Sequence, residues 1–244
     1  MFNINVEEIK DNRILTRVDV QRITFHIRQT FERYTELVLN GYLSAESKFT
    51  DPNGDDLDAK PFYPEVERDL NYVECNLGRN LEIIRTFCFE AENPKSYLEA
   101  AGVTDGYTSG GLNDFLYETL PPCLAFEGLL RSGVMEVPCK IEHVHWLLIH
   151  FFARLKLEYG SLSYGRLPDI DMVGDQIASL GIHESYFSFR ELTLLGGYKT
   201  ERAVRNLASP STPEHRRLPI IKNGRSTFLT HEVVSAWLKN VTSK

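Results

Sequence analysis

The chain has 244 residues, of which 42% are hydrophobic and 25% charged, so it has the composition of an ordinary globular protein with one large or two average domains. Its net charge of −7 excludes a protein that coats nucleic acid with its whole surface. The longest apolar run, residues 144–153, is too short to span a bilayer, and the acidic N-terminal segment is unlike a signal peptide. We therefore expect a cytoplasmic protein with no membrane partner.

Charge is distributed unevenly along the chain. Residues 186–244 carry ten Lys or Arg and four Asp or Glu, a net charge of +6, whereas residues 1–185 carry seventeen basic and thirty acidic side chains, a net −13. A basic segment on an acidic chain is the pattern of a localised phosphate-binding face. Any contact with nucleic acid is therefore expected in the last quarter of the sequence.

Helical periodicity begins early in the chain. Apolar side chains follow at helical spacing after Asp19, a predicted N-cap, up to a stop at Gly41, and again over residues 65–92. The connection between these helices holds an acidic run at residues 51–58. Because this run lacks the closing glutamate of a calcium loop, it is predicted to be a solvated turn.

Three more helices complete the predicted first domain. A short helix is expected to begin at Pro94, and another at Leu112, interrupted near Pro121-Pro122 and resuming afterwards. The third, over residues 140–159, is the most apolar of the chain. A helix that is hydrophobic on most sides is either central in its domain or a dimer contact.

A Gly/Ser/Pro-rich stretch at residues 160–168 is the expected domain boundary. It follows residues 1–160, which are predicted to be a helical body for dimerisation or effector binding. Residues 161–185 form a hinge with one linker helix, and residues 186–244 form the second domain. We therefore expect a mainly α fold with two parts.

The helical body offers little material for catalysis or for metal binding. His143, His145 and His150 lie on one predicted helix, but no two of them are three or four residues apart, as metal-binding pairs on a helix are. The cysteines form no C-x-x-C pair and are expected to be reduced core residues: Cys75, Cys88, Cys123 and Cys139. We expect no enzyme activity, metal or cofactor, and treat an enzyme site at the histidines as a third alternative.

Residues 186–207 predict two short helices joined by a tight turn. Ser188 and Glu191 have the spacing of a capping box at the start of the first helix. Paired glycines at 196–197 supply the turn, and the second helix is expected from Lys199 or Thr200 to Leu207. This arrangement buries one apolar side and leaves a hydrogen-bonding side outward.

The remaining residues predict a basic loop, a hairpin and a closing helix. After the loop at residues 208–217, a strand is expected over residues 218–221, and Asn-Gly at 223–224 is the signal of a tight hairpin. Thr230 is a predicted N-cap of the last helix, in which Trp237 is expected to anchor the core. Two helices followed by such a hairpin indicate a winged helix-turn-helix with a β-hairpin wing.

This segment resembles the winged helices of the phage excisionase and MerR-type group of DNA-binding proteins. The matching pieces are FREL at 189–192, TERAVR at 200–205, LPIIKNGR at 218–225 and THEVVSAWL at 230–238. The resemblance implies binding of double-stranded DNA, with the second helix in the major groove and the wing on the backbone. The DNA-binding residues that we predict are Lys199, Thr200, Arg202, Arg205, Asn206, Arg216, Arg217, Lys222, Asn223 and Arg225.

Two functions follow from these predictions. The first is a sequence-specific DNA-binding protein, a transcriptional regulator of bacterial or mobile-element origin, that acts as a homodimer through the helical body. The alternative is a protein-interaction or scaffold protein whose winged helix does not bind DNA, since a fold does not determine a function.

Overall fold

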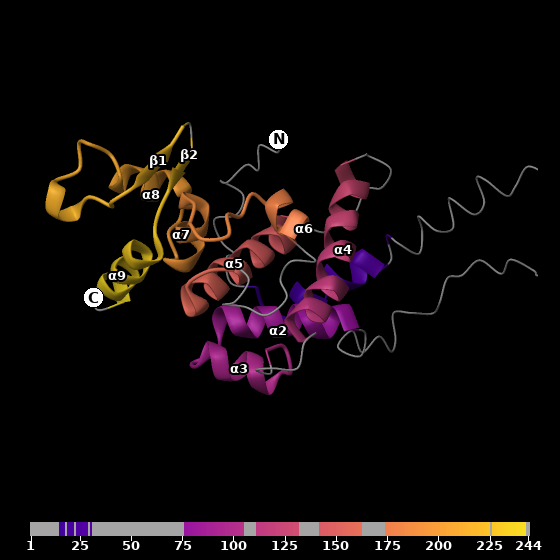
Figure 1. Ribbon diagram of the computed structural model, residues 1–244. Helices are drawn as coiled ribbons and strands as arrows, with labels where there is room; N and C mark the ends of the chain where they lie inside the picture. Colours follow the sequence, from indigo (N-terminus) through magenta and orange to yellow (C-terminus); the bar gives the residue numbers. More distant parts are fainter. Residues whose placement is uncertain are drawn as a thin grey trace, which may run out of the picture.

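The computed structural model describes part of a helix near the N-terminus and most of the chain from Asn76 onward (Figure 1). The described residues are 15–17, 19–21, 23–28, 30, 76–104, 111–131, 142–162, 174–224 and 226–242. They are mainly helical, with one two-stranded antiparallel sheet near the C-terminus. None of the helices among them is long and apolar enough to cross a membrane.

The first described helix begins earlier than its sequence indicates. The predicted N-cap Asp19 lies inside the helix, and Thr16 caps it instead. The Thr16 hydroxyl accepts from the Asp19 N–H at 3.2 Å, while the Asp19 carboxylate accepts from the Thr16 N–H at 2.9 Å. These reciprocal bonds satisfy two of the N–H groups that a helix start leaves unpaired, so the cap moves three residues upstream.

After this helix, the described part of the body holds five more, which correspond to the predicted series. They are α2 (Asn76–Phe89), α3 (Pro94–Ala100), α4 (Gly111–Arg131), α5 (Glu142–Tyr159) and α6 (Gly174–Ser179). Local signals account for α3: the Asn93 side chain accepts from the Ser96 N–H, and Gly102 ends the segment with a φ of 72°. Of the predicted elements, residues 65–75 and most of the expected hinge at 160–168 lie outside the described residues.

Helix α4 is continuous through Pro121 and Pro122, so the predicted interruption is wrong. Buried side chains on both sides of the prolines form one stripe at helical spacing, including Leu116, Leu120 and Cys123. Breaking the helix would move the second half of this stripe away from the core. Its burial outweighs the two backbone hydrogen bonds that the prolines cannot make.

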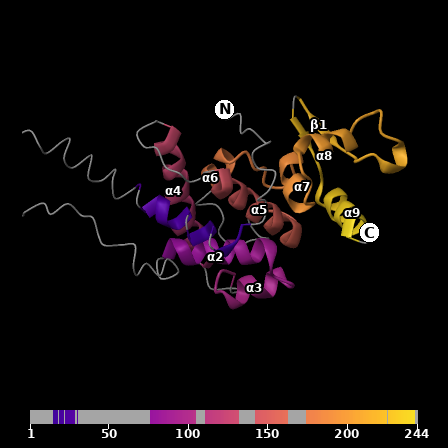
Figure 2. The same ribbon diagram turned by 180° about the vertical axis from the view of Figure 1, so that it is seen from behind.

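Helix α5 is central in the molecule. It lies between the other body helices and the C-terminal elements in both views of the ribbon (Figures 1 and 2), and it contacts α2, α7 and α9. Its apolar residues are buried on several sides, with Phe151, Phe152 and Leu155 at 0% exposure. Of the two roles open for this helix, the structure shows the central one.

The C-terminal elements surround a second, smaller core. They are α7 (Phe189–Leu195), α8 (Glu201–Leu207), a short 3₁₀ helix (Glu214–Arg216), β1 (Ile221–Asn223), β2 (Ser226–Phe228) and α9 (His231–Thr242). The buried centre of this core consists of Phe187, Leu192, Val204, Ala208, Leu218, Leu229 and Val234. Trp237 packs against these residues, as predicted, and its Nε1 donates to the Tyr198 hydroxyl at 2.6 Å.

The first strand starts later than predicted. Residues 218–220 do not pair with β2, because the Leu218 N–H donates to the Leu207 carbonyl at the end of α8. Leu218 is fully buried in the small core, which holds this segment against the helix. The ladder therefore begins at Ile221, opposite Phe228, and brings Lys222 opposite Thr227.

Candidate nucleic-acid interface

The helix pair α7 and α8 is built by local hydrogen bonds. The predicted capping box is confirmed: the Ser188 hydroxyl accepts from the Glu191 N–H, and the Glu191 carboxylate accepts from the Ser188 N–H. Gly197 has a φ of 62°, a left-handed conformation that glycine adopts without steric cost, and makes the turn between the helices. Thr200 is the N-cap of α8 and accepts from the Ala203 N–H at 3.2 Å.

One side of α8 is buried and the other carries the predicted contacts. Val204 is fully buried in the small core. Arg202, Arg205 and Asn206 are exposed on the helix, and Lys199 is exposed just before it. Thr200 is half-buried, and its hydroxyl oxygen already serves the cap. The structure thus leaves four of the predicted residues exposed on α8 or directly before it.

Arg205 is paired within α8. Its Nη2 lies 2.6 Å from Oε1 of Glu201, one turn earlier, and the two side chains are 63% and 29% exposed. An exposed ion pair at this spacing stabilises a helix by only about 0.3–0.5 kcal/mol. The ion pair therefore orients the Arg205 guanidinium and adds little to the stability of the helix.

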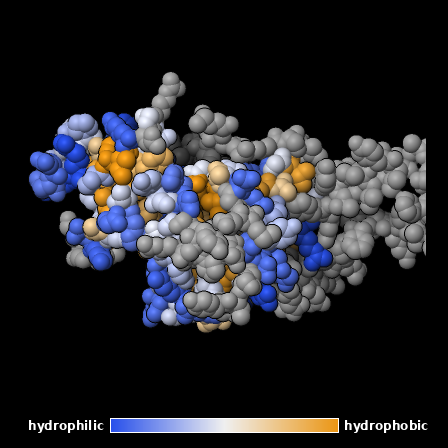
Figure 3. All heavy atoms as spheres, viewed as in Figure 1, coloured by the Kyte–Doolittle hydropathy of each residue, from blue (hydrophilic) through white to orange (hydrophobic). Residues whose placement is uncertain are grey.

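The basic loop between α8 and the hairpin has a defined conformation. Arg217 donates to the carbonyl oxygens of Pro210 and Thr212, with the shortest bond at 2.7 Å. The Thr212 hydroxyl donates to the Asn206 carbonyl at 2.7 Å and ties the loop to the end of α8. Arg217 thus folds the loop, whereas the side chain of Arg216 beside it is exposed. Hydrophilic side chains gather over this end of the molecule (Figure 3).

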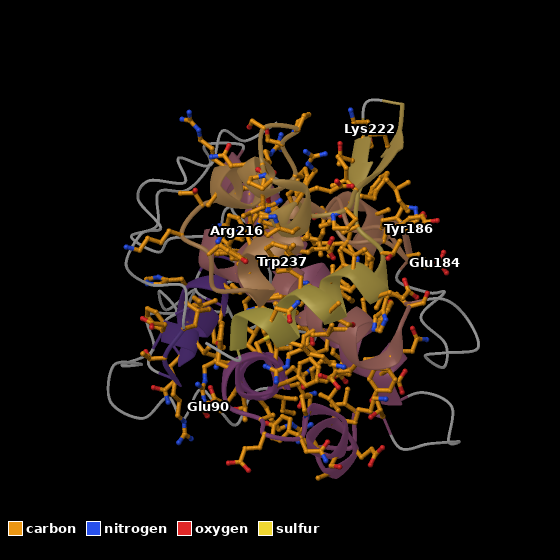
Figure 4. All side chains as sticks on the ribbon, turned by 90° about the vertical axis from the view of Figure 1, so that its left-hand side faces the viewer. Glu90, Glu184, Tyr186, Arg216, Lys222 and Trp237 are labelled. Atoms are coloured by element: carbon orange, nitrogen blue, oxygen red, sulfur yellow. The ribbon has the colours of Figure 1, made fainter. Side chains whose placement is uncertain are left out.

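The hairpin supplies the remaining predicted residues. Gly224 turns the chain with a φ of 60°, and Lys222 is exposed on β1. The hairpin and the loop after α8 lie toward the same end of the molecule (Figure 1), and Figure 4, which faces that end, shows Lys222 and Arg216 well apart on it. Arg225 and the side chain of Asn223 lie outside what the structure describes.

A buried ion pair, which the sequence did not lead us to expect, joins this module to the body. Nζ of Lys156, on α5, lies 2.6 Å from Oε1 of Glu191, on α7, and the two side chains are 0% and 1% exposed. The same Nζ donates to the carbonyl oxygens of His183, at 2.9 Å, and Tyr186, at 2.5 Å, and lies 4.6 Å from the centre of the Phe187 ring. Burial lowers the pKa of Lys156, and the charge of Glu191 opposes that shift. The only sign of this buried pair in the sequence was a lysine within an otherwise apolar helix.

Three further contacts join the same parts. Arg190 lies 4.5 Å from the centre of the Trp146 ring, and its Nη2 is 3.1 Å from Nδ1 of His145. Nε2 of His231, at the start of α9, is 2.9 Å from the Leu157 carbonyl oxygen. The candidate interface is therefore held against α5 at both α7 and α9.

The histidine-rich part of α5 has a structural explanation. His150 is buried, with its ring 5.0 Å from that of Phe89 in an edge-to-face arrangement. Burial first, and the charge of Arg154 second, lower the pKa of His150 to about 4. Among the described residues no group of His, Cys, Asp or Glu could hold a metal ion. The side chain of His143 lies outside the described residues.

Comparisons of the chain with models of protein families, with curated proteins and with solved structures found no match.

Proposed function

We propose that the chain is a sequence-specific DNA-binding protein, a transcriptional regulator whose residues 186–244 act as a winged helix-turn-helix. The observation that carries this proposal is the group of exposed basic side chains from three successive elements of one small module. They are Lys199 and Arg202 at α8, Arg216 on the loop and Lys222 on the hairpin. The module has a net charge of +6 on a chain whose remainder carries −13, so attraction to phosphates is concentrated there.

Helix α8 would contact the bases, and the loop and the hairpin would contact the phosphates. Helix α8 would enter the major groove, where arginine pairs with guanine and asparagine with adenine in bidentate geometry. Arg202 and Asn206 are exposed on α8 and suit that role. Lys222 and Arg216 lie beyond the helix and would contact phosphates, which sets orientation and adds affinity without reading sequence.

A homodimer belongs to the same proposal, because paired modules read repeated half-sites. The dimer would use mainly a surface of the body other than α5, since that helix already contacts α2, α7 and α9. The polar contacts between α5 and the module would then hold each module in a fixed orientation for its half-site.

The test is binding of the intact protein to random genomic fragments at two salt concentrations. We expect one sequence to be enriched and affinity to fall steeply with salt. Lys222→Ala should weaken binding to all sequences and reduce the salt slope by about one, whereas Arg202→Ala should relax the preference at one base pair. Arg79→Ala, which removes an exposed charge from α2, is the control and should change neither.

One observation favours a second function, that of a protein-interaction or scaffold module. Two of the predicted contacts, Arg205 and Arg217, are already hydrogen-bonded within the chain, as expected if the basic surface is structural. Under this alternative the protein would not be retained on DNA even at low salt, and Arg202→Ala would leave retention unchanged.

A further inference from the structure

Arg205 of α8 is held by a carboxylate and an aromatic ring of its own module. Its Nε and Nη2 both donate to Oε1 of Glu201, at 2.9 and 2.6 Å. Its guanidinium carbon lies 5.7 Å from the centre of the Phe189 ring. Because the Arg205 side chain remains 63% exposed, these contacts orient a guanidinium that faces solvent.

The contact with Glu201 occupies one edge of the guanidinium. A guanidinium has five N–H donors, and the pair uses the one on Nε and one of the two on Nη2. The donors left over are both of those on Nη1 and the second one on Nη2, along the end of the group. Two adjacent acceptors fit there, and guanine presents such a pair, O6 and N7, in the major groove.

The charge of Glu201 also acts on a guanidinium that is held against the body. Arg190 on α7 lies against the Trp146 ring of α5, and burial lowers the Arg190 pKa while the charge of Glu201 acts in the opposite direction. The carboxylate of Glu201 is therefore hydrogen-bonded to the Arg205 guanidinium and is attracted electrostatically to that of Arg190 as well.

We propose that Glu201 is a positioning residue that holds Arg205 for recognition of a guanine in double-stranded DNA, an inference that rests on the proposed DNA binding. By charge alone, Glu201 repels phosphate and weakens binding to every sequence. Through Arg205, it strengthens binding to sequences with guanine at one position. The two effects together raise the ratio of specific to non-specific affinity.

The test uses the full chain and a duplex that the wild-type protein selects from a randomised pool. Dissociation constants for this duplex and for a scrambled one are measured with the wild type, Glu201→Ala, Glu201→Gln and Arg205→Ala. Glu214→Ala is the charge-matched control, because Glu214 is exposed on the neighbouring loop and its removal leaves the pair with Arg205 intact. Circular dichroism of each variant checks that the fold is retained.

We expect Glu201→Ala and Glu214→Ala to tighten binding to the scrambled duplex alike. Only Glu201→Ala should lower the ratio of specific to non-specific affinity, by roughly tenfold. Glu201→Gln, whose amide oxygen can still accept from Arg205, should retain more of the ratio. The double variant Glu201→Ala/Arg205→Ala should be no worse in ratio than Arg205→Ala, since residues that act as a unit are not additive.

The two proposals fail in different ways. If the wild type selects no sequence from the pool, DNA recognition is refuted, and the role of Glu201 with it. If the wild type selects a sequence and Glu201→Ala keeps the same base preference and the same affinity ratio, only the role of Glu201 is refuted. An equal loss of ratio in Glu214→Ala would also refute it, because charge alone would then explain the effect.

Discussion

Replacement of Lys156 by methionine tests the joint between the body and the C-terminal module. Lys156 and Glu191 are 0% and 1% exposed, and their charged groups are 2.6 Å apart. Methionine fills a similar volume but leaves the Glu191 carboxylate buried without its partner. It also leaves the carbonyl oxygens of His183 and Tyr186 without the ammonium that donates to them.

The expected loss is large because one charge stays in the core. Removing one partner of a buried ion pair costs about 3–5 kcal/mol in the free energy of unfolding. Replacing both partners costs much less, since no uncompensated charge is left. We therefore expect about 3–5 kcal/mol for Lys156→Met and a similar loss for Glu191→Gln. The double variant Lys156→Met/Glu191→Gln should lose markedly less than the sum of the two single losses.

Urea denaturation at pH 7, followed by circular dichroism, measures these differences. Lys199→Met is the matched control, because Lys199 is exposed and a surface change of this kind usually stays within about 0.5 kcal/mol. A loss below about 1 kcal/mol for Lys156→Met, or full additivity in the double variant, would show that the pair is not the buried joint described above.

Three further predictions concern single residues. Burial lowers the pKa of His150 in the folded protein to about 4, below the ordinary 6.5. The unfolded chain therefore binds a proton at higher pH than the folded protein does, and the free energy of unfolding falls as the pH drops from 6.5 toward 4. The free energy of unfolding should fall by about 2 kcal/mol more between pH 7.5 and 5 in the wild type than in His150→Leu, as urea titrations at both pH values would show. Pro122→Ala should raise the melting temperature, because alanine restores a backbone N–H inside α4 and is the better helix former by up to about 3 kcal/mol; an unchanged or lower value would contradict the continuous helix. Arg217→Ala should release the loop that Arg217 holds through two carbonyl oxygens and increase cleavage of the loop at Arg216 by trypsin-like proteases. The double variant Arg216→Ala/Arg217→Ala is the control, because it lacks the cleavage site. Equal cleavage of the wild type and Arg217→Ala would show that these hydrogen bonds do not hold the loop.

Short-range signals in the sequence predicted much of the local structure. The capping box of Ser188 and Glu191, the glycine turn before α8 and the Asn-Gly hairpin all appear as expected. Each depends on hydrogen bonds or φ angles within a few residues, so the amino-acid types at those positions decide the outcome. The outward position of Arg202 and Asn206 followed from helical periodicity for the same reason.

Tertiary contacts decided what those signals left open or indicated wrongly. Periodicity showed that α5 is apolar on most sides, but only its contacts with α2, α7 and α9 make it central rather than a dimer surface. Pro121 and Pro122 indicated a break, yet one buried stripe continues past them. The partners of Lys156 lie 27 positions or more away in the sequence, at the carbonyl oxygens of His183 and Tyr186 and at the carboxylate of Glu191. Local patterns hold no information on such pairs, because burial and partner choice depend on which faces meet when the chain packs.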